Sequence, residues 1–474
     1  MNASSIPNKL PDHGRFLAKP PWRTQIKHLL AGVGIILVCL GCGETPPGGN
    51  PPATTVINPP GPRPTTSVEA ARPISPRRAG TAKILWATPP IDSEKLRQAI
   101  DRATGYLVKH CRPNGKFEYV VHPDPSVNLA PSYNILRHAG AIFSLGMAHK
   151  RSASGDVRET MLRATEFLQK HALAEVSGTP DMAAIWSKPT LNHGEHGNEA
   201  KLGGTALGIL ALRATASATT TTPPSEQLRR LGNFLLYMQN EDGSFRSIHV
   251  DNPAEKREFQ SLYYPGQAAL ALAELYQLDQ DTKWLEAGLR GIAFLEHSQR
   301  SRHQPRPDHW MLLAAARLLQ VYDECPTPAI SRSAMFRHVT RTCNKMIQDQ
   351  QPYLHDTKIA GCFVDDGRTT PSAIRLEGLL AALSIMGDDH QALKQEMQEA
   401  IIHGIRFLLR CQVLEGPYAG GIPCASEFIA SGDPARDEEA KRHVAEIRID
   451  YVQHALSAMI QYETWVAGQS IKAP

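Results

Sequence analysis

The chain has 474 residues, of which 42% are hydrophobic and 21% charged, and its formal net charge is +4. This composition is typical of a globular protein with a sizeable core and excludes a wholly disordered chain. Because the net charge is small and no Lys/Arg run occurs in the part expected to fold, the sequence lacks the electrostatic footprint of a nucleic-acid-binding protein.

Residues 1–42 have the layout of an export signal. Basic residues precede an uncharged apolar run, Leu29 to Leu40. A helix that crosses a bilayer needs about 20 apolar residues, so this shorter run favours a signal peptide over a retained membrane anchor. The following Gly41-Cys42 resembles a bacterial lipoprotein signal, in which the cysteine is lipidated, although Cys39 stands where that signal usually has Leu. We therefore expect an exported protein of the cell envelope, attached to a membrane through Cys42.

Residues 43–88 are rich in Pro, Gly and Thr and contain the pairs Pro46-Pro47, Pro51-Pro52 and Pro59-Pro60. Such a segment buries too little apolar surface to fold, and its prolines keep the chain extended. The sequence therefore predicts a disordered linker between the N-terminal segment and a folded domain at residues 89–468.

Within this domain, amphipathic helices are predicted at residues 92–111, 156–172, 225–239, 284–299, 335–350 and 390–412. Several of them end with Phe-Leu-x-x-x-Gln, as at residues 234–239 and 407–412. The next turn sometimes contains a glycine, such as Gly115 or Gly243, which supplies the positive φ that a helix end or turn needs. We expect these helices on the outside of the domain.

A second set of helices, more apolar and richer in Ala and Gly, alternates with the first. It is predicted at residues 133–149, 199–215, 263–278, 308–322, 371–386 and 448–462. Helices that are apolar nearly all round are buried, so these should form an inner ring. No strand-like alternation of useful length competes with the helices. The expected fold class is all-α, an α/α toroid of six helical hairpins.

These paired helices, with their Phe-Leu-x-x-x-Gln and Gly-x-Phe motifs, resemble the α/α-toroid superfamily over about residues 90 to 465. That superfamily includes six-hairpin glycosidases, polysaccharide lyases, sugar epimerases, and the terpene-cyclase and prenyltransferase domains. The resemblance implies a substrate mouth at the N-termini of the inner helices, where helix dipoles favour polar or anionic ligands. Because one fold hosts many functions, it does not specify the reaction.

When the inner helices are aligned on their small residues, cations and aromatic side chains share one level near the N-termini, a set that suits a carboxylated sugar ring. The substrate-binding candidates are Arg137, Lys201, Tyr263, Tyr264, Trp310, Arg375 and Tyr451. The catalytic candidates around that level are His138, Glu199, Asp308 and Asp450, with His309, Asp365 and Asp366 nearby. Hydrolysis needs two carboxyl groups, whereas elimination or epimerisation needs a base such as His beside the sugar. The acids also sit where helix caps belong, and that structural role is the alternative for each.

The loop before the second inner helix is the densest polar stretch and contains His193, Glu195 and His196. These residues are weak metal-ligand candidates, because their spacing is not that of the HExxH motif. A loop that contacts substrate is the favoured interpretation. The sequence predicts no metal and no cofactor.

The leading functional prediction is an extracytoplasmic carbohydrate-active enzyme, a lyase, hydrolase or epimerase, acting on an acidic polysaccharide or oligosaccharide. The alternative is a non-enzymatic envelope lipoprotein that binds a glycan or a protein. A terpene-cyclase-like enzyme is a second alternative. It is disfavoured because only Asp365-Asp366 echoes the Asp-x-Asp-Asp motif of that family, and because 6% aromatic residues is few for a carbocation cavity.

Overall fold

The computed structural model describes residues 91–193, 197–218, 225–252, 259–429 and 433–472, which lie in one compact unit, Cys42–Pro474. The predicted signal segment with Cys42, the linker at 43–88, and the metal-ligand candidates Glu195 and His196 lie outside the described residues. Within the described ranges, no helix is both long enough and apolar enough to cross a membrane.

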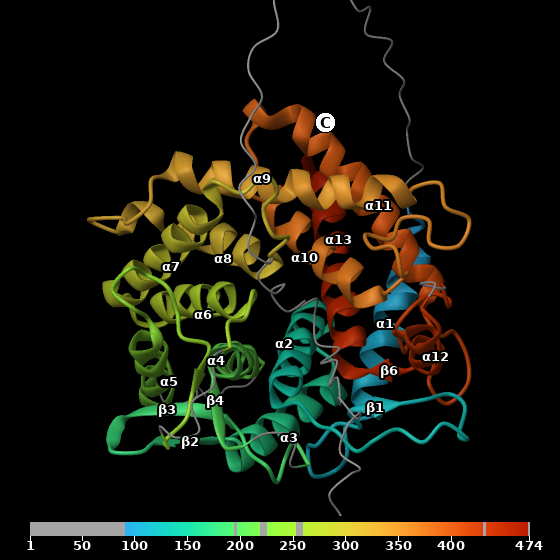
Figure 1. Ribbon diagram of the computed structural model, residues 1–474, viewed down its shortest axis with the longest axis horizontal. Helices are drawn as coiled ribbons and strands as arrows, with labels where there is room; N and C mark the ends of the chain where they lie inside the picture. The colour runs from blue at the N-terminus through green and yellow to red at the C-terminus, as the bar shows by residue number, and fades with distance from the viewer. Residues whose placement is uncertain (1–90, 194–196, 219–224, 253–258, 430–432, 473–474) are drawn as a thin grey trace, which may run out of the picture. The chain divides into compact units, whose positions relative to one another are not determined.

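Six helices form a closed inner ring (Figure 1). In ring order they are α2 (Ile135–Ser152), α4 (Leu202–Ser217), α6 (Tyr264–Asp279), α8 (His309–Gln320), α10 (Thr369–Leu383) and α13 (Ile449–Lys472), and α13 packs against α2. Small residues allow this close packing. A Cβ added to Gly266 of α6 would lie 2.8 Å from Cβ of Trp310 in α8, and one added to Gly378 of α10 would lie 3.0 Å from Cβ of His309.

A second set of helices surrounds this ring, and each of its members precedes an inner helix in the chain. They are α1 (Ser93–Lys109), α3 (Gly155–His171), α5 (Ser225–Met238), α7 (Thr282–Arg300), α9 (Arg332–Gln350) and α11 (Gln391–Cys411). Side-chain caps fix several starts: Asp92, Asp281 and Ser331 each accept a hydrogen bond from a backbone N–H in the first turn. The predicted α/α toroid of six hairpins is confirmed.

The repeated glutamines and glycines join neighbouring outer helices. Gln239, at the end of α5, donates from Nε2 to the Ala287 carbonyl of α7 at 2.9 Å. Gly243 follows in the turn with a φ of +87°, and a Cβ there would lie 2.5 Å from the Arg290 carbonyl oxygen of α7. We call this pair of contacts a Gln–Gly junction.

The same junction recurs at two further places. Gln350 donates to the Ala400 carbonyl, and Gly361 approaches the His403 carbonyl, so α9 is joined to α11. Gln412 donates to the Ala99 carbonyl at 2.9 Å, and Gly420 lies against the Arg102 carbonyl. This last junction joins α11 to α1, so it closes the outer layer as well.

The prediction that no strands compete with the helices was wrong between α3 and α6. β2 (Leu173–Val176), β3 (Thr179–Ser187), β4 (Glu199–Lys201) and β5 (Ile248–His249) form an antiparallel sheet in that order. The last five residues of β3 are all buried, because the strand packs on α4 and α5, and a strand buried on both faces shows no alternation. Glu199 and Lys201, predicted to begin a helix, therefore lie in a strand.

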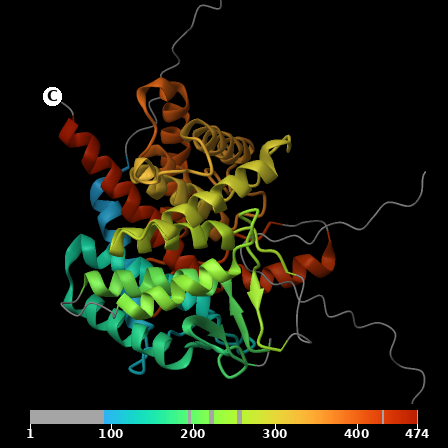
Figure 2. The same ribbon diagram turned by 90° about the vertical axis from the view of Figure 1, so that its left-hand side faces the viewer.

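A two-residue strand pair and a short helix also lie near the N-termini of inner helices. β1 (Val120–Val121) pairs with β6 (Ile447–Arg448), which leads directly into α13, as β4 leads into α4. The helix α12 (Pro434–His443) precedes β6. In Figure 2 the green strands of the four-stranded sheet and the red-orange α12 lie toward the right-hand side of the helices. The described residues also contain the 3₁₀ turns η2 (Tyr322–Glu324), η3 (Gln351–Tyr353) and η4 (Asp388–His390).

Candidate active site

Asp450, in the first turn of α13, is held between two arginines. Its side chain is 1% exposed; Nε of Arg137 lies 3.0 Å from Oδ2, and Arg448 donates to both carboxylate oxygens, at 2.6 and 3.1 Å. Burial opposes ionisation of this carboxyl group, but the two guanidinium groups outweigh it and lower the pKa to about 2. Asp450 is therefore ionised at neutral pH and fixes the position of Arg137, which also donates to the Tyr119 hydroxyl.

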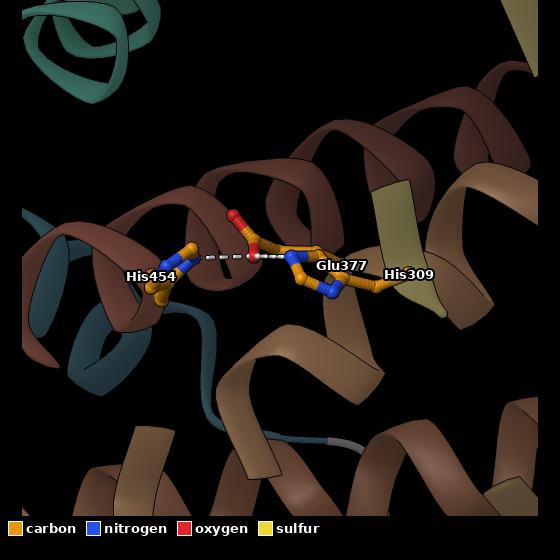
Figure 3. A group of neighbouring side chains, drawn as sticks. All are labelled: His309, Glu377 and His454. Carbon is orange, nitrogen blue, oxygen red and sulfur yellow. Dashed lines mark hydrogen bonds and ion pairs between the residues drawn. The ribbon is translucent and has the colours of Figure 1, made fainter. Parts of the chain in front are cut away.

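Next to this group, two histidines from facing helices meet one carboxylate (Figure 3). Nδ1 of His454 in α13 donates to Oε2 of Glu377 in α10 at 2.8 Å. Nε2 of His309, the first residue of α8, lies 4.0 Å from the same oxygen. All three side chains are buried. In the part of the chain that the structure describes, neither ring nitrogen of His309 has a hydrogen-bond partner, and a polar group buried without one is costly unless a ligand satisfies it.

The surroundings shift the pKa values of the two histidines in opposite directions. Burial lowers the pKa of His309 well below its usual value, and the charges of His454 and Arg375 lower it further. Burial also acts against protonation of His454, but the Glu377 carboxylate beside it raises the pKa overall. His309 is therefore a neutral imidazole at neutral pH, whereas the protonated form of His454 is stabilised. Opposed shifts of this kind are typical of paired acid and base groups.

Asp308, which precedes His309, caps α8. Its Oδ1 accepts from the Met311 N–H at 3.1 Å, while Oδ2 is buried and has no partner among the described residues. Burial raises the pKa of this carboxyl group to about 7, so a substantial fraction carries a proton at neutral pH. The cap role and the acid role both predicted for Asp308 fit this geometry.

Aromatic side chains stand around His309. The ring of Tyr263 meets it edge-on with centroids 5.2 Å apart, and the ring of Trp310 lies at 5.0 Å. The rings of Trp310 and His454 also meet edge-on, with their centroids 6.4 Å apart. The ring of Tyr264 packs against that of Phe259, with centroids 6.0 Å apart. Flat apolar faces beside polar hydrogen-bonding groups are what a sugar ring requires, so this wall suits a carbohydrate.

The other predicted residues are engaged elsewhere. Tyr451 is buried, donates to Glu446 and lies under the Arg448 guanidinium. Arg375 donates to the Pro371 carbonyl and lies 3.6 Å from Asp349. Nζ of Lys201 lies 3.6 Å from the Glu199 carboxylate on the same strand. The three cations expected to bind a substrate carboxylate are thus each beside a protein carboxylate.

His138, predicted as a catalytic residue, is fully buried between α2 and α3. Tyr133 donates to its Nδ1 at 2.7 Å, and its Nε2 donates to the Ala164 carbonyl at 2.8 Å. Burial lowers its pKa to about 4. Because both nitrogens are used inside the protein, this geometry favours a structural role. His193 is exposed with a φ of +56°.

Glu377, His454 and Arg448 are the site residues that the sequence did not single out. Glu377 lies in the third turn of α10 and His454 in the second turn of α13, both deeper than the level used to align the inner helices. The available signal was an ionisable residue inside an otherwise apolar helix, because such a residue is rarely buried without a partner.

The trio His309, Glu377 and His454 also has the ligand types of a zinc site. One ligand atom from each residue lies within 4.8 Å of the others, and it is the one such group of three in the described part of the chain. Imidazole nitrogens with a carboxylate oxygen can bind Zn²⁺. The short His454–Glu377 hydrogen bond already satisfies two of the three groups, which favours acid–base work over metal binding.

Solved structures with the same architecture include a D-mannose isomerase, with a TM-score of 0.55 over 80% of this chain and 100% of its own at 14% identity. A cellobiose 2-epimerase from Spirochaeta thermophila DSM 6192 has a TM-score of 0.53 at 15% identity, and the match covers 79% of this chain and 97% of the epimerase. A GH76 α-mannanase from Bacteroides thetaiotaomicron has a TM-score of 0.53 at 10% identity, and the match covers 79% of this chain and 97% of the mannanase. No family profile matches the sequence, and no similar sequence is found among curated proteins. At these identities, the comparisons establish the α/α-toroid fold.

Proposed function

We propose that this protein is a carbohydrate-active enzyme that moves a proton on a sugar, as an isomerase or epimerase. The observation that carries the proposal is the placement of His309 and His454 around Glu377, with both ring nitrogens of His309 buried and without a partner in the described structure. Similarity in fold to a D-mannose isomerase and a cellobiose 2-epimerase supports it.

The chemistry follows from the two protonation states. Neutral His309 removes the proton from the carbon beside the sugar carbonyl, and the C–H electron pair forms the carbon–carbon double bond of an enediol. The carbonyl π electrons move to the oxygen, which takes a proton from His454. For isomerisation, His309 returns the proton to the neighbouring carbon, while the hydroxyl on the first carbon gives its proton to His454 and becomes the new carbonyl. For epimerisation, the enediol turns so that His309 protonates the opposite face of the same carbon, while the original oxygen returns its proton to His454 and becomes the carbonyl again. Glu377 stabilises the cationic form of His454 with which the reaction begins and ends.

Hydrolysis of a glycosidic bond is the second candidate, favoured by Asp308. A carboxyl group with a pKa of about 7 and an unpartnered oxygen is suited to protonate a leaving group. Glu377 would be the second carboxyl group that hydrolysis requires. Similarity in fold to a GH76 α-mannanase supports this candidate.

The test is an NMR assay of the purified chain in deuterated water with neutral and acidic mono- and oligosaccharides. We expect deuterium to enter the sugar beside its carbonyl group, and His309→Gln to slow this exchange by about 10²–10⁴-fold. The matched control is His297→Gln, because His297 is an exposed histidine of α7 and should not matter.

Other outcomes identify other activities. New reducing ends without exchange indicate a hydrolase, and a new unsaturated uronate indicates a lyase. Binding without turnover of any sugar indicates the glycan-binding alternative. Loss of activity after dialysis against a chelator, with recovery on adding Zn²⁺, would mean that the trio works as a metal site and would overturn the acid–base assignment.

A further inference from the structure

A cavity of about 320 Å³ lies beside the candidate site, at the end of α7 and the start of α6. This volume is in the range of about 300–1,000 Å³ that is usual for small-molecule pockets. Its wall includes Ser261, Leu262 and Pro265, which flank Tyr263, whose ring contacts His309. The cavity and the candidate site thus share the segment 261–265 as a common wall.

Two arginines, Arg302 and Arg306, line this cavity, and among the residues that the structure describes no acidic one does. Both are exposed, and in the described residues neither guanidinium forms an ion pair. They differ in this from Arg137, Lys201 and Arg375, each of which lies beside a carboxylate. Of these five cations, Arg302 and Arg306 are therefore the two that have no carboxylate beside them among the described residues.

The loop that carries the two arginines is held in place. The Arg306 N–H donates to Oε1 of buried Gln299 at 2.6 Å, and Arg341 of α9 donates to the Arg302 carbonyl at 2.7 Å. Arg341 also donates to the Gln299 carbonyl, so it covers carbonyls at the C-terminus of α7 that would repel an anion. A fixed loop lowers the entropic cost of binding.

Arg306 is only three residues from His309, so their Cα atoms are at most about 11 Å apart. The remaining wall includes Phe294, which is partly exposed, and Pro265. These apolar faces suit the face of a sugar ring, while guanidinium groups suit an oxyanion.

We propose that this cavity binds an acidic sugar unit of the substrate, with Arg302 and Arg306 contacting its sulfate, phosphate or carboxylate group. This inference rests on the proposed function, because it assumes that the neighbouring site acts on carbohydrate. In this proposal, the residues that recognise the anion lie outside the inner ring, on the loop between α7 and α8.

The test measures binding of glucose, glucuronate, glucose 6-sulfate and glucose 6-phosphate to the full chain by calorimetry. We expect at least one acidic sugar to bind more tightly than glucose, and the double variant Arg302→Gln/Arg306→Gln to weaken it at least tenfold without changing the melting temperature. The acidic sugar most affected identifies the anion. The control is Lys150→Gln/Arg158→Gln, which removes two exposed charges from α2 and α3.

The inference is overturned if glucose binds as well as its acidic derivatives, if the double variant binds them like the wild type, or if the control weakens binding equally. Exchange of deuterium is followed in the same samples. If deuterium exchange is unchanged by the loss of both arginines, only the proposal that the cavity binds the acidic sugar is contradicted. If an acidic sugar binds specifically but no exchange occurs, only the isomerase or epimerase proposal is contradicted.

Discussion

His138 and His309 are both fully buried, but only His138 has hydrogen-bond partners for both ring nitrogens. A glutamine at position 138 can still accept from Tyr133 and donate to the Ala164 carbonyl. We therefore expect His138→Gln to change kcat little, while His309→Gln keeps the melting temperature and loses activity. Steady-state kinetics and thermal melts of the two variants measure this contrast, and a large loss of kcat in His138→Gln would return that residue to the catalytic set.

His138 also makes the stability of the protein depend on pH. Burial lowers the pKa of His138 from 6.5 to about 4, so the unfolded chain binds a proton between these values that the folded chain does not. The contribution of neutral His138 to the free energy of unfolding, on the order of 3 kcal/mol, is therefore fully present above pH 6.5 and is lost as the pH falls toward 4. Urea unfolding at several pH values should show a weaker pH dependence in His138→Gln; equal slopes would mean that other groups dominate.

Asp450 is predicted to matter for folding as much as for chemistry. Asp450→Asn leaves two arginines, Arg137 and Arg448, without their shared carboxylate, and Arg448 is buried. Breaking a buried ion pair in this way lowers the free energy of unfolding by about 3–5 kcal/mol. The comparison is Arg229→Ala, which removes a partly exposed pair with Asp279 and should cost under about 1 kcal/mol. Equal losses in urea unfolding would contradict the assigned burial effect.

At the scale of elements, the Gln–Gly junction can be tested against a matched glycine. Gly243 and Gly178 both have positive φ, +87° and +75°, but a Cβ would strike the Arg290 carbonyl only at Gly243 and meets nothing within 4 Å at Gly178. Gly178→Ala should cost about 1–2 kcal/mol for the backbone conformation alone. Gly243→Ala should cost about 1–3 kcal/mol more, because α5 and α7 must move apart. Similar losses for both in chemical denaturation would leave the junction without energetic weight.

The helices were predictable from sequence because their apolar periodicity extends over many residues. β3 was not, since its second half, from Ala183 to Ser187, is buried at every position and shows no alternation, and the strand contacts α4 and α5. The candidate site was predictable in part. Asp308, His309 and Asp450 stand at helix starts, which the pattern locates, whereas Glu377 and His454 meet only once α10 and α13 are packed side by side.

At the scale of the whole molecule, the cellular location of the protein remains a prediction from the sequence. The N-terminal segment and Cys42 lie outside the described residues, and their sequence predicts a lipoprotein of the cell envelope. We expect the expressed chain to fractionate with membranes and to carry a lipid on Cys42 that mass spectrometry detects. Cys42→Ala should release it to the soluble fraction of the exported proteins, and a soluble wild-type chain without the modification would refute the lipid anchor.

The three Gln–Gly junctions have one further consequence. In an open array of repeats, the first and last units each lack a neighbour and need capping, and unfolding can begin at these ends. Here the contacts that join α5 to α7 also join α11 to α1, so the domain has no terminal repeat. Unfolding therefore has no terminal hairpin from which to begin. Loss of one hairpin removes two neighbours at once, and the domain should melt in a single cooperative transition despite its length.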